Sequence, residues 1–431
     1  MWATVIARRA GIVIFYVVAS ILLAACGGAG SVPGGGSHPG QTPPGKPVLD
    51  NWVTFAHDAK HTSASAASLT GSLKQAWRYN PVPLSGNTFG SMFCAIATTA
   101  GVYTHWSQYG TTVFAGGPSY DGLSTSGAHL WTYVEHRDYD EGHWLSIFNN
   151  EVVYQDDQQG FLNIGTGAVV SVPGKPWGTG FDLWGETIPD PSGLYAANTF
   201  LADGADLFVY SLDSTGAARW RALQQKSTKY SQDSNGGLVL SNGTLFYAAN
   251  YSDPSPNSSG IYALNSSTGA VITHVATTPV SEMSADANNI YLVELPSNLV
   301  ARSQSNLQKV WSVNLTAYSF APPVLANGLV IVSSFNGVEA HDATTGKVVW
   351  TSPVRASSSG QYSSSMFAAL GSSTLLVTSF DALHLLNLST GAEIWHGGVA
   401  GAANPVIVSD PALGVTVYVT DGTGVIALVP G

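Results

Sequence analysis

Short apolar runs, separated by Gly, Asn, Asp and Ser, follow one another along most of the chain after residue 50. Residues 322–342 read PPVLANGLVIVSSFNGVEAHD, in which three apolar runs are divided by two turn signals. Runs of this kind, rich in β-branched residues and bounded by turn residues, are typical of strands in tight hairpins. The pattern therefore predicts many short antiparallel strands rather than helices.

A second pattern follows each set of runs and recurs along the chain. Residues 340–350 read AHDATTGKVVW, and residues 385–395 read LLNLSTGAEIW with Asx, Thr-Gly and Trp at the same spacing. Residues 263–273 and 161–171 keep Asn and Thr-Gly but end in Thr273 and Ser171. Eight copies end near residues 77, 131, 171, 220, 273, 311, 350 and 395, at spacings of 38 to 54 residues. Four strands in each unit of this length indicate the blades of a β-propeller.

The recurring turn has a physical basis in its residue types. Asp342 is placed to accept backbone N–H bonds in an Asx turn. Gly346 can adopt positive φ without steric cost. The indole of Trp350 is a large, flat apolar ring system with one N–H donor, which suits packing between blades.

The two ends of the propeller region complement each other. Residues 404–430 read as three strands without a fourth, whereas the strand that ends at Trp77 lacks three partners. Joining them would close the ring and remove open sheet edges. We therefore predict an all-β domain over residues 49–431, a monomeric eight-bladed β-propeller of four-stranded antiparallel blades closed by its N- and C-terminal strands.

The repeat resembles the motif of the PQQ-like, quinoprotein-type β-propeller family, Ala-x-Asp-x-x-Thr-Gly-x-x-x-Trp. Ala340, Asp342, Thr345, Gly346 and Trp350 match all its fixed positions. The resemblance implies that each tryptophan packs against the glycine region of the adjacent blade. The blade-docking residues it implies are Trp77, Trp131, Gly216, Trp220, Gly269, Trp311, Asp342, Gly346, Trp350, Gly391 and Trp395. Residues 51–65 resemble the opening segment of non-enzymatic members.

The N-terminal region reads as a targeting segment. Arg8 and Arg9 precede an apolar run that ends at Leu23-Ala24-Ala25-Cys26, which resembles the lipobox of bacterial lipoproteins. The resemblance implies a signal peptide over residues 1–25, lipidation of Cys26 and a membrane anchor there; an ordinary secretory signal is the alternative. Residues 26–48, rich in Gly and Pro, read as a flexible tether. In enteric lipoproteins, an Asp directly after the lipidated cysteine retains the protein in the inner membrane. Gly27 stands at that position here, so the resemblance implies the outer membrane, with the propeller facing the periplasm.

Charge and cysteine content limit the possible binding partners and the possible disulfide pairing. The net charge of −11 argues against nucleic-acid binding. The chain has two cysteines, so a lipidated Cys26 would leave Cys94 without an intrachain partner. Residues 91–95 (SMFCA) align with residues 365–369 (SMFAA), so we expect Cys94 to be a small buried side chain.

Candidate chemistry is sparse. His57 and His61 have the i, i+4 spacing of two metal ligands on a helix, with Asp58 beside them. The surrounding Ser- and Ala-rich stretch offers no further ligand, so we expect no metal. Segments that connect repeats or lengthen their loops are the candidate binding surface; packing beneath the loops, or a merely solvated connection, is the alternative. The candidate residues are Trp106, Tyr109, Tyr120, Glu135, His136, Asp138, Asp140, His143, Trp177 and Trp184.

Two function classes remain, because the chain shows no nucleophile elbow, zinc signature or P-loop. The resemblance implies either a quinoprotein dehydrogenase that uses PQQ and calcium, or a non-catalytic lipoprotein similar to the propeller lipoprotein of the BAM outer-membrane assembly complex. The chain lacks the Cys-Cys pair typical of those dehydrogenases. We therefore expect a lipid-anchored scaffold without cofactor that binds an envelope protein or ligand, and outer-membrane protein assembly is the narrower expectation.

Overall fold

The computed structural model describes most of the predicted propeller region. The described part comprises strands, bridges and turns, and within it no helix is long and apolar enough to cross a membrane. It covers residues 50–431 except for 55, 70, 110–116, 136–144, 156–158, 171–182, 185–186, 201–205, 227–233, 251–258, 317–321, 335, 356–366, 372, 380, 401–402 and 411–413. The signal peptide, Cys26 and the tether expected over residues 1–48 lie outside the described residues.

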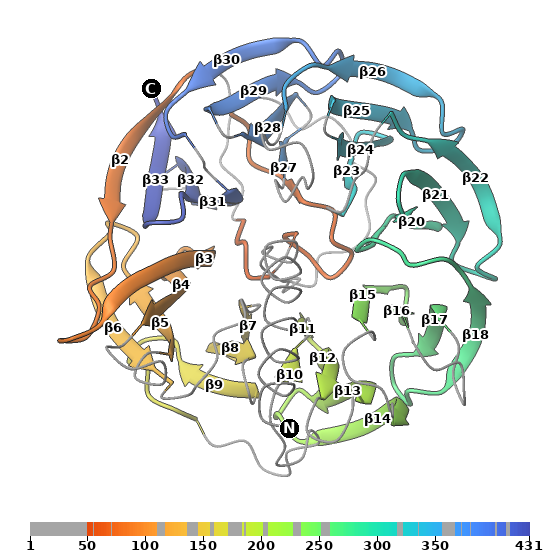
Figure 1. Ribbon diagram of the computed structural model, residues 1–431, viewed down its shortest axis with the longest axis horizontal. Coiled ribbons are helices and arrows are strands. Elements are labelled where there is room, and N and C mark those ends of the chain that lie inside the picture. Colours follow the sequence, from red (N-terminus) through yellow and green to blue (C-terminus); the bar gives the residue numbers. More distant parts are fainter. Residues whose placement is uncertain are drawn as a thin grey trace, which may run out of the picture.

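Eight antiparallel sheets surround a central axis as the blades of a propeller (Figure 1). Four blades have the predicted four strands in chain order, from the axis to the rim. Blade 1 is β3 (Thr88–Thr98), β4 (Gly101–Tyr109), β5 (Gly117–Leu123) and β6 (His129–Val134). Blade 4 is β15 (Ser234–Ser241), β16 (Thr244–Asn250), β17 (Gly260–Asn265) and β18 (Val271–Ala276). Blade 5 is β19 (Ser284–Ala285), β20 (Asn289–Glu294), β21 (Asn298–Ser303) and β22 (Lys309–Asn314), and blade 6 is β23 (Val324–Ala326), β24 (Leu329–Ser334), β25 (Gly337–Asp342) and β26 (Val348–Ser352).

Three blades depart from four regular strands. Blade 2 has β7 (Leu145–Phe148), β8 (Glu151–Gln155) and β9 (Gln159–Asn163), and a single bridge from Leu162 to Val169 takes the place of its fourth strand. In blade 3, β10 (Leu183–Trp184) and β11 (Thr187–Asp190) both pair with β12 (Gly193–Phe200), which pairs with β13 (Asp206–Asp213) and then β14 (Ala218–Lys226). Blade 7 has β27 (Phe367–Leu370), β28 (Thr374–Thr378), β29 (Leu383–Asn387) and β30 (Glu393–Gly397), with β1 (Ala64–Ser65) added parallel to β27.

Blade 8 confirms the predicted closure of the ring. It contains β31 (Ala403–Asp410), β32 (Gly414–Thr420) and β33 (Val425–Pro430), and β2 (Leu73–Tyr79) pairs antiparallel with β33 as its outer strand. The Arg78 guanidinium also pairs with Asp421 at 2.7 Å across this junction. The chain is therefore an eight-bladed β-propeller, as predicted.

Burial explains why the inner strands are so apolar. Middle strands such as β28 lie between two neighbouring blades and are buried along their whole length, so both of their faces favour apolar side chains. Rim strands such as β22 have one free edge and remain largely exposed. Tight turns join the strands, and Asn327 and Gly328 both have positive φ, of 50° and 73°, as a type I′ hairpin requires.

The alternation of strand direction gives the propeller two different faces. Within each blade, the turns between the first and second strands and between the third and fourth open on one face, and they are short, as at 242–243 and 266–270. We name this the short-turn face. The connections between second and third strands, and between blades, open on the opposite face and include 80–87 and 277–283. We name it the long-connection face.

Candidate functional site

An N-terminal segment, residues 50–66, winds once around the axis inside the ring; we name it the inner strap (Figure 1). It contacts the inner strands of all eight blades in their order around the ring, mostly through backbone hydrogen bonds. The contacts are Asp50 with Ser409 of β31, Trp52 with Ala97 of β3, Val53 with Ile147 of β7, Thr54 with Thr187 of β11, Ala59 with Leu240 of β15, Lys60 with Ala285 of β19, Thr62 with Leu325 of β23, and Ala64–Ser65 with Ala369 and Leu370 of β27.

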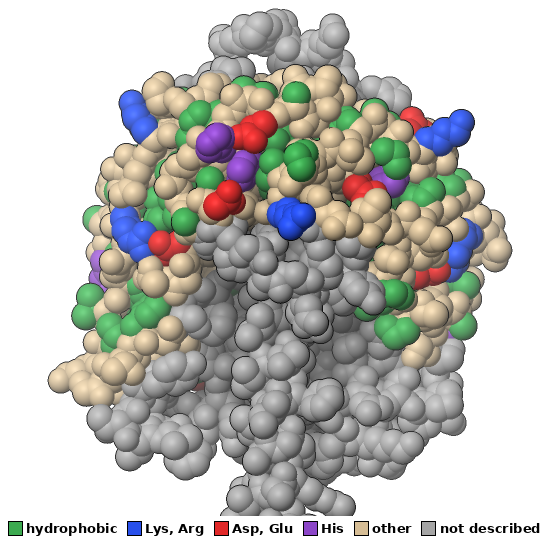
Figure 2. All heavy atoms as spheres, turned by 45° about the horizontal axis from the view of Figure 1, so that its top comes forward, with side chains coloured by type: hydrophobic (Ala, Val, Ile, Leu, Met, Phe, Trp, Pro, Cys, Tyr) green, Lys and Arg blue, Asp and Glu red, His purple; other side chains and the backbone are tan. Residues whose placement is uncertain are grey.

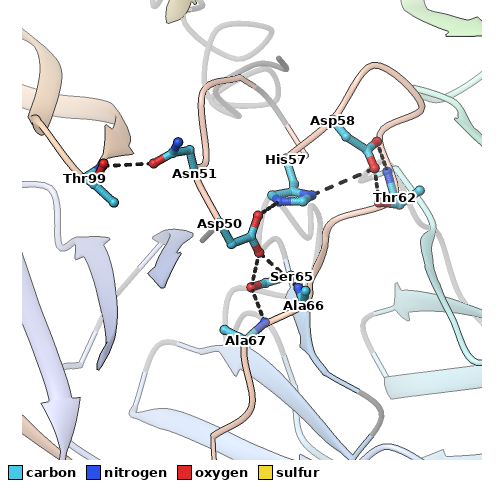
Figure 3. Close-up of polar contacts among 9 residues, drawn as sticks. All are labelled: Asp50, Asn51, His57, Asp58, Thr62, Ser65, Ala66, Ala67 and Thr99. Carbon is cyan, nitrogen blue, oxygen red and sulfur yellow. Dashed lines mark hydrogen bonds and ion pairs between the residues drawn. The ribbon is translucent and has the colours of Figure 1, made fainter. Parts of the chain in front are cut away.

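Asp50 joins the beginning of the inner strap to its end. Its Oδ2 accepts hydrogen bonds from the Ser65 hydroxyl at 2.6 Å and from the Ala66 backbone N–H at 3.0 Å. Its Oδ1 lies 2.8 Å from Nε2 of His57 (Figure 3). One carboxylate therefore fixes both ends of the strap and its middle.

His57 lies between two carboxylates. Its Nδ1 is 3.9 Å from Oδ2 of Asp58, which also accepts the Thr62 hydroxyl at 2.6 Å. Burial alone would lower the pKa of His57, but hydrogen bonding and charge attraction from Asp50 and Asp58 outweigh burial and raise this pKa to about 10. Burial alone would raise the pKa of Asp50 and of Asp58, but hydrogen bonding and charge attraction from His57 outweigh burial and lower both pKa values. The centre of the strap is therefore an ion-paired cluster at neutral pH.

His57 has its partners within this cluster, and His61 has a separate partner. Nδ1 of His61 lies 3.2 Å from the Met283 carbonyl oxygen, and His61 is fully buried. Across the described ranges, no group of three or more His, Cys, Asp or Glu side chains is placed to hold a metal ion.

The repeated tryptophans contact the next blade. Nε1 of Trp350 donates to the Leu388 carbonyl at 2.9 Å, and a Cβ at Gly391 would lie 2.4 Å from the Trp350 ring. Gly391 has φ of 69°, so only a residue without a side chain fits beneath the indole. The same arrangement joins Trp77 to Gly127, Trp131 to Gly167, Trp220 to Gly269 and Trp311 to Gly346.

The other three blade interfaces lack one or both partners. Gly216 follows the copy that ends in Ser171, and a Cβ at Gly216 would meet no atom within 4 Å. Thr273 faces a blade in which Leu307, with φ of 58°, stands at the glycine position. Trp395 precedes blade 8, where the glycine position is Leu73. The tryptophan–glycine pair therefore joins five of eight interfaces.

The candidate loop residues do not form one surface in the described structure. Trp106 and Tyr120 lie in β4 and β5 and are each 1% exposed, so the prediction that they lie in exposed loops is wrong. Glu135, at the end of blade 1, is also mostly buried. Tyr109 ends β4 and Trp184 ends β10. His136, Asp138, Asp140, His143 and Trp177 lie outside the described residues.

Sequence reasoning missed a buried acid beside Trp106. Asp121 is fully buried in β5 and accepts hydrogen bonds from the Trp106 indole at 2.8 Å, the Tyr79 hydroxyl at 2.9 Å and the Thr132 hydroxyl at 2.6 Å. Burial raises the pKa of Asp121, and these donors only partly offset the effect. Tyr79 belongs to blade 8 and the others to blade 1, so Asp121 joins two blades. The available signal was a single Asp in a stretch, GPSYDGL, that has no other charged residue.

A hollow of about 630 Å³ lies at blade 7. Its lining combines Arg355, Asp381 and Glu393 with His384, which is 7% exposed and whose Nδ1 has no hydrogen-bond partner within the described part of the chain. Figure 2 shows the side of the molecule at the top of Figure 1, where histidine side chains lie beside acidic ones. The charges of both signs suit a polar ligand better than a polyanion.

Cys94 lies in β3 and is fully buried, as expected for its position in the repeat. It is disulfide-bonded in this structure. The expectation that it has no intrachain partner applied to a chain lipidated at Cys26; Cys26 lies outside the described residues, so that expectation stays a prediction.

Comparisons with known proteins agree with the ring geometry. A family model described as outer membrane protein assembly factor BamB matches residues 257–429. The crystal structure of BamB from Moraxella catarrhalis is similar over 83% of this chain and 98% of its own, at 16% identity and a TM-score of 0.54. In fold, this chain is similar to PQQ-like β-propellers, and the family match covers its C-terminal part. No curated protein sequence matches it.

PQQ-like propellers with enzymatic names are similar as well. Quinohemoprotein alcohol dehydrogenase from Comamonas testosteroni matches over 88% of this chain and 80% of its own, at 13% identity and a TM-score of 0.65. A europium-containing methanol dehydrogenase matches over 87% and 90%, also at 13% identity and 0.65. At these identities the likeness shows the fold alone.

The described residues of this propeller do not fit a quinone with its calcium ion. Calcium requires six to eight oxygen ligands, and the described part of the chain contains no group of carboxylates placed for a metal. PQQ carries three carboxylates, whereas the described hollow at blade 7 sets one Arg against two acids. The inner strap also lines the axis along the inner strands.

Proposed function

We propose that this protein is a non-catalytic, lipid-anchored extracytoplasmic scaffold that binds a protein partner, with outer-membrane protein assembly as its specific role. The observation that carries the proposal is the match of residues 257–429 to the BamB family model. A periplasm-facing location at the outer membrane belongs to the same proposal. The lipobox-like sequence that ends at Cys26 supports the anchor.

The construction of the ring supports a binding scaffold. Five tryptophan–glycine pairs, the closure of β2 on β33 and the inner strap make the blades mutually dependent. A rigid ring of this kind presents loops at fixed positions, which is how scaffold proteins carry binding surfaces. Catalytic groups are not needed for that role.

A quinoprotein dehydrogenase is the second candidate function. Its favouring observation is the TM-score of 0.65 to two dehydrogenases, against 0.54 to BamB. The misfit of the described residues to a polyanionic quinone and calcium counts against it.

Calorimetric titration of the purified protein with PQQ, in calcium and again in EDTA, separates the two candidates. We expect no calcium-dependent binding and no dye-linked oxidation of alcohols or sugars. Binding accompanied by turnover would overturn the scaffold proposal.

Photo-crosslinking in native envelopes tests the role itself. A crosslinker at Val82, which is 80% exposed on the long-connection face, is compared with one at Ser267 on the short-turn face. We expect an outer-membrane assembly component among the adducts at Val82. Adducts that contain only unrelated abundant proteins at both positions would contradict the assembly role.

A further inference from the structure

The direction of the inner strap shows where the preceding chain lies. The inner strand of each blade ends at the short-turn face. Ser409 and Ala97 form bridges with the strap, and they lie one residue before the ends of β31 and β3. Both bridges, Asp50 to Ser409 and Trp52 to Ala97, are antiparallel. The strap at Asp50 therefore runs inward from the short-turn face, so the described chain enters the axis from that face.

Two further observations locate the two ends of the strap at the short-turn face. The Asn51 side-chain oxygen accepts the Thr99 backbone N–H at 2.9 Å, and Thr99 lies in the turn between β3 and β4 on the short-turn face (Figure 3). The strap then leaves in the opposite sense, because β1 runs parallel to β27. The chain thus enters and leaves the axis on one face.

We propose that the short-turn face is the membrane-proximal surface of the protein and that the long-connection face points away from the lipid. This inference rests on the proposed lipid anchor at Cys26. A Gly- and Pro-rich tether from residue 26 to residue 49 has a root-mean-square reach of about 25–30 Å. That reach holds the short-turn face nearest the lipid surface, since the tether is attached at its centre.

Pairs of positions at the two ends of one rim strand give a matched test. Ser267 and Thr278 are exposed at opposite ends of β18, and Ser389 and Ala400 are exposed at opposite ends of β30. Each is changed to Cys in a Cys94→Ala background, labelled with a fluorophore, and the lipidated full chain is placed on phosphatidylglycerol-containing vesicles that carry a headgroup quencher. We expect quenching at Ser267→Cys and Ser389→Cys to exceed that at Thr278→Cys and Ala400→Cys at least threefold.

Equal or reversed quenching within both pairs would overturn the orientation. Failure of the chain to float with vesicles would instead refute the anchor. In that case the chain from residue 27, with an N-terminal hexahistidine held on nickel-chelating lipids, still tests the face: the same threefold ratio upholds the orientation, and its absence overturns it.

Discussion

At the scale of single residues, the tryptophan–glycine pair is the joint between blades. Trp350 is 7% exposed and donates its indole N–H to the next blade. Replacement of Trp350 by Ala removes both the packed indole ring and its hydrogen bond to the Leu388 carbonyl. We expect Trp350→Ala to lower the free energy of unfolding by about 3–5 kcal/mol, measured by urea denaturation.

Trp395 provides the matched control, because it is half-buried and faces Leu73 rather than a glycine. Trp395→Ala should cost less than half as much. Equal losses for both variants would mean that the glycine pairing adds nothing to the joint.

The glycines make the complementary prediction. Gly391 and Gly216 share positive φ, but only Gly391 has an indole above it. Gly216→Ala should cost about 1–2 kcal/mol from the backbone alone. Gly391→Ala should cost at least about 2 kcal/mol more, since the new methyl displaces Trp350. Thermal unfolding of the two variants measures this difference, and similar midpoints would refute it.

His57 should make stability depend on pH. Its pKa in the folded protein, about 10, exceeds the ordinary 6.5, so its stabilising effect is complete below pH 6.5 and is lost as the pH rises toward 10. Asp50 has a lowered pKa, so its contribution is present above pH 3.8 and falls in acid. Urea midpoints of the wild type and His57→Gln should converge between pH 6.5 and 10. A constant gap between them would contradict the ion-paired cluster.

The residue scale also shows what sequence could and could not predict. Asp342, Gly346 and Trp350 stood out because their spacing recurs. His57 and Asp50 are seven residues apart, and nothing in a single copy indicates that they meet. Trp106 was predicted on a loop because it lies in a stretch that lengthens the first unit, but it belongs to β4 and its partner Asp121 lies in the next strand of the same blade.

At the scale of elements, the interface between blades 4 and 5 differs from its neighbours. It lacks both members of the pair, with Thr273 on one side and the buried Leu307 on the other. The guanidinium of Arg302 donates to the Leu307 carbonyl at 2.9 Å. Substitution at one side alone leaves a clash or a cavity.

A double-mutant cycle tests this interface. Thr273→Trp alone should destabilise because Leu307 blocks the indole, and Leu307→Gly alone should destabilise by opening a cavity. The double variant should be more stable than the sum of the two effects by at least about 1 kcal/mol. Additive effects in denaturation would show that the two positions do not meet.

Blade boundaries were easier to predict than blade contents. The Thr-Gly turn marks the third and fourth strands in most copies, so eight units and their closure followed from spacing. The added β1, the doubled β10 and β11, and the missing fourth strand of blade 2 depend on contacts between distant segments. No local pattern encodes those contacts.

At the scale of the whole molecule, the two cysteines connect anchoring to the state of the fold. Cys94 is disulfide-bonded in this structure, and a sulfur in a thioether cannot also form a disulfide. Lipidation of Cys26 as proposed would therefore leave that sulfur unavailable to a disulfide. We expect the mass of the membrane-extracted protein, after reduction and denaturation, to include acyl chains, and the mass of the Cys26→Ser variant to lack them. A wild-type mass without acyl chains would refute the anchor.

The inner strap also constrains the order in which the protein can be completed. Asp50 pairs with β31, and β2 pairs with β33, so the first described residues need partners from the last thirty of the sequence. A chain that emerges from a translocon N-terminus first would hold these segments unpaired until export is finished. Contacts of such long sequence separation fold slowly and expose strand edges in the interval. If the chain is exported as proposed, the circular strap therefore leaves the nascent propeller with unpaired strand edges until its final blade has crossed the membrane.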